Sequence, residues 1–154
     1  MTISEQQIQS GLLLPGFIRA LFLMSLVALV AVCHIYAEQI QLGFDLQERV
    51  VLRTVLYIVA ILSFPVMKFI RHVLVHLNKT SSRGGTAKSR YLSTIIISML
   101  LAETIGFYGV LMYVLGDGFN TLYIFVGLSA LAMFLYQPKS KEYISIIKAL
   151  DVDK

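Results

Sequence analysis

The fold is decided by one apolar stretch, YLSTIIISMLLAETIGFYGVLMYVL, which occupies residues 91–115. An α-helix rises about 1.5 Å per residue, so a stretch of this length crosses about 30 Å of hydrocarbon. Three further apolar stretches lie at about residues 17–36, 50–70 and 119–137. Lipid cannot satisfy free backbone groups, and the alternation typical of strands is absent. The sequence therefore predicts four transmembrane helices.

The composition supports this interpretation. Of the 154 residues, 57% are hydrophobic and only 14% are charged, whereas a soluble domain is about 25% charged. The four stretches use most of the chain, which excludes a soluble enzyme, a nucleic-acid-binding domain and a disulfide scaffold. We expect residues 1–154 to form a single transmembrane domain, an all-α integral membrane four-helix bundle. We expect no enzymatic activity, no cofactor and no metal site.

The distribution of cations predicts the orientation of the bundle. The end of the second stretch and the basic linker at residues 71–90 carry six cations and no acid: Lys68, Arg71, Lys79, Arg83, Lys88 and Arg90. The connection after the first stretch holds three acids, and the turn at 116–118 contains only Asp117. By the positive-inside rule, both termini and the basic linker should lie in the cytoplasm.

The expected location is a bacterial-type inner (plasma) membrane, which the chain should cross several times. The net charge of +4 follows from this orientation signal, with attraction to anionic lipid as a secondary effect. The lipid bilayer is thus the expected partner, and no nucleic acid is needed to explain the charge.

Glu103 is the one acid inside a predicted span, twelve residues from either end of 91–115. An ionised carboxylate near the bilayer midplane costs roughly 2.5–3.5 kcal/mol on insertion scales, so the protonated form is expected. No cation is predicted at the same depth, and the candidate partners are hydroxyl groups. The candidate ion-binding residues are Glu103, Tyr108, Ser63 and Ser129. Glu103 could form hydrogen bonds between helices as a protonated acid, act as a reversibly protonated group, or contact a lipid or ligand.

A stripe of small residues runs along the same predicted helix, and its spacing permits close contact with another helix. Its members are Ser98, Ala102, Gly106 and Gly109. Gly127 and Ala130 in the fourth stretch offer a counter-face. The stripe can serve packing within one chain, or contact with a second copy or another membrane subunit.

Residues 101–111, LAETIGFYGVL, resemble the proton-carrying helix of the proteolipid (c) subunits of rotary F- and V-type ATPases. This resemblance implies that Glu103 is the ion-binding acid and that Tyr108 is its neighbour in the site. The partner helix in that family is a glycine ladder, whereas residues 50–70 contain no glycine. The whole chain also looks like small uncharacterised four-helix bacterial membrane proteins, and that likeness implies no activity.

Two further features carry weaker signals. His72 and His76 have the i, i+4 spacing that can hold a metal, but a helix that continues beyond the membrane with both rings in water explains them better. The amphipathic tail at residues 139–154 suits a short helix that lies either at the inner membrane interface or against the bundle's own loops.

Two functions remain open from the sequence. The first is a non-enzymatic subunit or scaffold of a membrane protein assembly. The second is a proton- or ion-translocating channel or rotor element that works through reversible protonation of Glu103.

Overall fold

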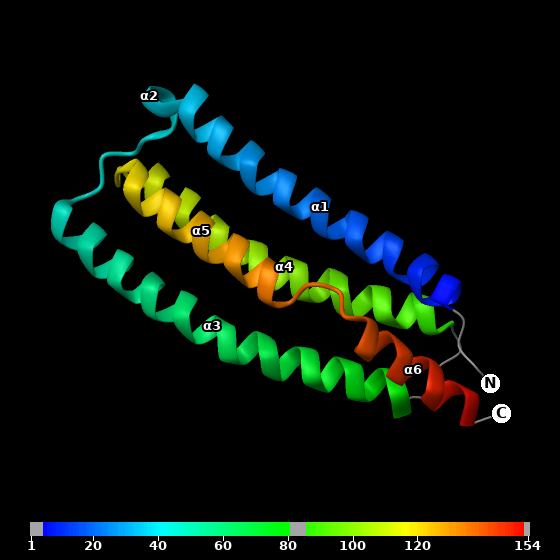
Figure 1. Ribbon diagram of the computed structural model, residues 1–154. Coiled ribbons are helices and arrows are strands. Elements are labelled where there is room, and N and C mark those ends of the chain that lie inside the picture. The colour runs from blue at the N-terminus through cyan, green and yellow to red at the C-terminus, as the bar shows by residue number, and fades with distance from the viewer. Residues whose placement is uncertain (1–4, 81–85, 153–154) are drawn as a thin grey trace.

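The computed structural model describes residues 5–80 and 86–152 and is all-α throughout them, as predicted. The long helices run lengthwise side by side, and a short helix lies at either end (Figure 1). In chain order the helices are α1 (Glu5–Ile35), α2 (Ala37–Ile40), α3 (Leu46–Thr80), α4 (Ala87–Val114), α5 (Phe119–Leu135) and α6 (Ser140–Val152).

Within residues 5–80 and 86–152, three helices are long and apolar enough to cross a membrane, namely α1, α3 and α4. The fourth predicted span corresponds to α5, which has 17 residues. Together with α6 it forms a pair bent by 46°, and that pair passes the same criterion as one broken span. The described residues therefore contain three candidate spans, or four if the bent pair is counted as one span, as expected of a polytopic membrane protein.

The central helix of the bundle is α4. In the most apolar 18-residue segment of α4, 50% is buried inside the protein, against 11% in the corresponding segments of α1 and α3. It contacts α5 along its length, and α1 and α3 flank it. The side chains of α1 and α3 therefore supply most of the surface that meets lipid, and the small residues of α4 lie inside the bundle.

The first turns of α4 and the last turns of α3 lie at the same end of the bundle as α6 (Figure 1), and we call this the basic end. Within the predicted basic linker at 71–90, α3 remains helical through Thr80 and α4 begins at Ala87. Within the predicted linker, Arg83 lies outside the described residues.

The tail forms α6, which packs against the bundle. Ile146 is fully buried and Tyr143 is 7% exposed, and the rings of Tyr143 and Tyr91 lie 5.5 Å apart between centroids. Gly11 of α1 leaves room for Tyr143, since a Cβ at Gly11 would clash with its ring. The predicted tail is thus a helix that packs on the bundle's own helices α1, α3 and α4.

At the opposite end, α3 holds the tight turn between α4 and α5. Gly116 has a φ of 91°, a conformation that glycine adopts without steric cost. Arg49 donates a hydrogen bond to the carbonyl oxygen of Gly116, and Arg53 forms an ion pair of 3.3 Å with Asp117. These contacts give the two arginines at the start of α3 partners within the chain.

Candidate functional site

Glu103 lies at one edge of the buried face of α4 and is 8% exposed. A Cβ at Gly106, three residues later, would lie 2.6 Å from Leu26 of α1 and 3.3 Å from Oγ of Ser129 of α5. Because successive residues turn by about 100° around a helix, Ala102 lies on the α5 side of Gly106 and Glu103 on the other side. Glu103 is therefore positioned where α4 meets α1.

The carboxyl group of Glu103 makes no hydrogen bond or ion pair with any residue that the structure describes. Among the described residues, the solvent-inaccessible side-chain nitrogen and oxygen atoms without a hydrogen-bond partner are Nε of Arg19 and Nε of Arg49. The carboxyl oxygens of Glu103 have no partner and are not among these atoms, so they are accessible from outside the bundle. The carboxyl tip therefore reaches the surface of the bundle while the rest of the side chain is buried. Leu100 and Phe107, each 50% exposed, lie on neighbouring turns of the same helix.

The two serine hydroxyls predicted to bind Glu103 donate to backbone carbonyls. Ser129 donates to the carbonyl of Ala102 at 2.7 Å, and Ser63 donates to Val59 in its own helix at 2.7 Å. Tyr108 packs edge-on against the ring of Phe125, with 6.3 Å between centroids. Five residues along a helix correspond to about 140° of rotation, so Tyr108 lies on nearly the opposite side of α4 from Glu103.

The stripe of small residues packs inside the chain. Ser98, Ala102, Gly106 and Gly109 are all buried. A Cβ at Gly109 would lie 2.8 Å from Cβ of Phe125 and 3.0 Å from the carbonyl oxygen of Leu122, so α4 and α5 approach closely there. The counter-face on α5 includes Leu122, Phe125 and Ser129, whereas a Cβ at Gly127 would meet nothing within 4 Å.

A second polar cluster, which the sequence did not indicate, lies around Arg71 at the basic end. Arg71 is 5% exposed, and its Nη2 atom lies 2.7 Å from a carboxylate oxygen of Glu142 in α6. The same guanidinium donates to the carbonyl of Gln137 at 3.0 Å and to that of Tyr136. Arg71 therefore ties α3 to the connection between α5 and α6, where backbone carbonyls are left without helical partners.

The histidines do not converge on a metal site in the described residues, which contain no group of three or more potential ligands from His, Cys, Asp and Glu. His72 and His76 are both exposed on α3. His34 lies at the other end of the bundle and bonds through Nε2 to the hydroxyl of Tyr123 at 2.8 Å. Cys33, the only cysteine, is 2% exposed.

Comparison with known proteins gives no relative for this chain: no family model, curated protein or solved structure is significantly similar to it.

Proposed function

We propose that this protein is a non-enzymatic subunit or scaffold of a membrane protein assembly in a bacterial-type inner membrane. In this proposal α5 is the fourth span, and both termini and the basic end lie in the cytoplasm, since the cations gather there.

One observation carries the proposal. The carboxyl group of Glu103 has no partner among the described residues, yet its tip reaches the bundle surface where α4 meets α1. In hydrocarbon a polar group without a hydrogen bond is costly. A polar group from a neighbouring subunit or a second copy of this chain, placed against this flank, would satisfy the carboxyl.

The surface around Glu103 supports a protein contact. Leu100 and Phe107 are exposed on the turns before and after it, so the three side chains follow the i, i+3, i+7 spacing of a helix-packing stripe. Such an apolar strip with one central polar group can define a single docking register, because the polar group needs a partner at its own depth.

The test measures the mass of particles taken from the native membrane into nanodiscs without detergent. We expect particles of constant stoichiometry heavier than the 17.3 kDa chain for the wild type and for Glu103→Gln, whose amide can still form hydrogen bonds. Glu103→Leu should leave mainly the monomer. Thr104→Val is the matched control, because Thr104 is exposed on the same turn and its hydroxyl already donates to Leu100.

A monomeric wild type would overturn the proposal, and full assembly of Glu103→Leu would remove Glu103 from the contact. The second candidate is a proton- or ion-translocating element, as the resemblance to ATPase c subunits implies. It is favoured by the same carboxyl group, which has no permanent cation beside it among the described residues. In that case Glu103→Gln should assemble normally but abolish proton flux in reconstituted vesicles.

A further inference from the structure

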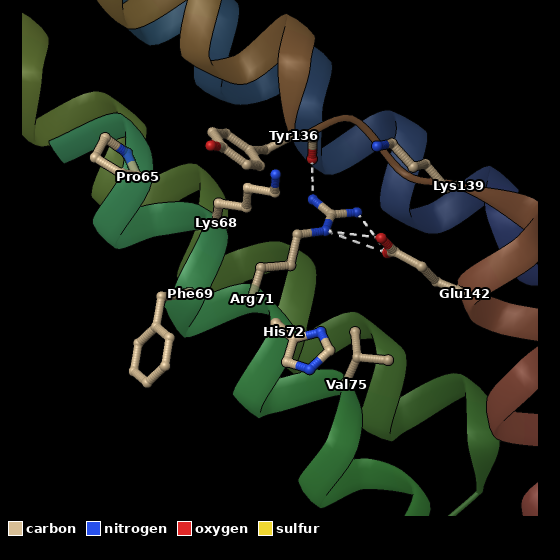
Figure 2. A pocket seen from close by; sticks show the side chains of 9 residues that line it. All are labelled: Pro65, Lys68, Phe69, Arg71, His72, Val75, Tyr136, Lys139 and Glu142. Atoms are coloured by element: carbon tan, nitrogen blue, oxygen red, sulfur yellow. Dashed lines mark hydrogen bonds and ion pairs between the residues drawn. The ribbon is translucent and has the colours of Figure 1, made fainter. Parts of the chain in front are cut away.

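A cavity of about 540 Å³ opens at the basic end, where α3 meets the connection between α5 and α6. Figure 2 shows that Lys68 and Arg71 enter it from α3, whereas Lys139 and Glu142 come from the chain after α5. The cavity therefore depends on the position of α6, which the ion pair between Arg71 and Glu142 fixes.

The cavity carries positive charge that the chain itself does not neutralise. Its charged lining comprises Lys68, Arg71, Lys139 and Glu142, so three cations and one carboxylate leave a formal charge of +2. Glu142 is held by Arg71 through both Nε and Nη2. The amino groups of Lys68 and Lys139 have no ion pair or hydrogen bond with the described residues. Both are exposed and free to bind an anion.

Apolar side chains from the same helix as Lys68 and Arg71 also line the cavity. Pro65, Phe69 and Val75 line it from α3, and Phe69 is 69% exposed. Lys68 and Phe69 lie at the boundary where the predicted second span ends, so one side of the cavity faces the headgroup region and the other faces acyl chains. A ligand that fits both sides has an anionic head and a hydrocarbon tail.

We propose that this cavity is a specific site for an anionic phospholipid, with the phosphate between Lys68 and Lys139 and an acyl chain along Pro65 and Phe69. Basic pockets between transmembrane helices on the cytoplasmic side commonly bind such headgroups. Arg71 acts as a positioning residue, because its donors are directed to Glu142 and to backbone carbonyls. This site is independent of Glu103 and of the proposed assembly.

The test is a titration of the full chain in detergent, in which native mass spectrometry counts bound phosphatidylglycerol or phosphatidylcholine. We expect the first phosphatidylglycerol to bind at least tenfold more tightly than phosphatidylcholine. Each lysine near a membrane surface contributes about fivefold to anionic lipid binding. The double variant Lys68→Gln/Lys139→Gln should therefore bind the first phosphatidylglycerol roughly 10- to 30-fold more weakly.

The matched control is Lys88→Gln/Lys148→Gln, which removes the same charge from two exposed lysines that do not line the cavity. This variant should change the affinity by less than twofold. Equal losses in the two double variants would mean general surface attraction and overturn the proposal, as would no loss in either. Glycerol phosphate, the soluble headgroup, should not displace the lipid at millimolar concentration. Displacement would mean a site for free phosphate esters and would also overturn the lipid assignment.

Discussion

Ser129 donates a hydrogen bond of 2.7 Å to the main-chain carbonyl of Ala102, the residue directly before Glu103. The Ser129 hydroxyl, which was predicted to bind the Glu103 carboxyl group, therefore joins α5 to the backbone of α4. Ser129 is fully buried, and Gly106 beside it leaves the space in which the two helices approach. The Ser129 hydroxyl thus holds two helices together and, among the residues that the structure describes, makes no hydrogen bond with Glu103.

Removing this contact should destabilise the protein by a modest amount. Hydrogen bonds between transmembrane helices are worth about 0.6 kcal/mol on average and at most about 1.7 kcal/mol, so we expect Ser129→Ala to cost about 1 kcal/mol. Thermal unfolding in detergent can be followed with a dye that reacts with the thiol of the buried Cys33. Ser63→Ala is the control, since Ser63 bonds only within its own helix. Equal losses in the two variants would contradict an interhelical role for Ser129.

Gly109 should tolerate no side chain. A methyl group there would lie 2.8 Å from Cβ of Phe125 and 3.0 Å from the backbone oxygen of Leu122, neither of which can move without separating α4 from α5. Overpacking of this kind typically costs about 1–3 kcal/mol, and we expect Gly109→Ala to lower the unfolding temperature accordingly.

Gly127→Ala is the matched substitution on α5, because a Cβ there would meet nothing within 4 Å. Alanine favours a helix over glycine by up to about 1 kcal/mol, so this variant should be neutral or slightly stabilised in the same assay. A loss at Gly127 as large as that at Gly109 would mean that the close approach of the two helices does not lie at Gly109.

Arg71 should matter more for stability than the other cations at the basic end. Removing one partner of a largely buried ion pair leaves the other charge uncompensated. Because Glu142 keeps some exposure, at 24% of its side chain, we expect Arg71→Gln to cost about 2–3 kcal/mol. The shorter, unforked ammonium of Arg71→Lys should recover only part of this.

The control for Arg71 is Lys68→Gln, which removes the same charge from an exposed side chain three residues earlier in α3. It should change the unfolding temperature little, because surface charges of this kind contribute at most about 1 kcal/mol. Proteolysis offers a second measurement, since α6 should become accessible to protease in Arg71→Gln and stay protected in Lys68→Gln. Unchanged protection of α6 in Arg71→Gln would mean that the ion pair does not hold this helix.

The apolar stretches, the turn at Gly116 and the buried stripe of α4 could be predicted because hydropathy, small-residue spacing and turn residues are local properties of the sequence. The pairing of Arg71 with Glu142 could not, since it depends on the direction in which the chain leaves α5. The same holds for Arg53 and Asp117. The separation of Tyr108 from Glu103 could be predicted, because helix geometry alone places the two residues about 140° apart around the axis of α4.

Glu103 itself should be a destabilising residue in the isolated chain. A polar group without a hydrogen bond in apolar surroundings costs about 1–3 kcal/mol, and an apolar group of similar shape removes that cost. We therefore expect Glu103→Leu to raise the unfolding temperature of the purified monomer, even though the same variant should lose assembly. Glu103→Gln should bring no gain, because the amide also lacks a partner. Thr104→Leu controls for the added leucine at an exposed position. If Glu103→Leu instead lowers the unfolding temperature, the carboxyl group has a stabilising partner within the chain, and the assembly proposal loses the observation on which it rests.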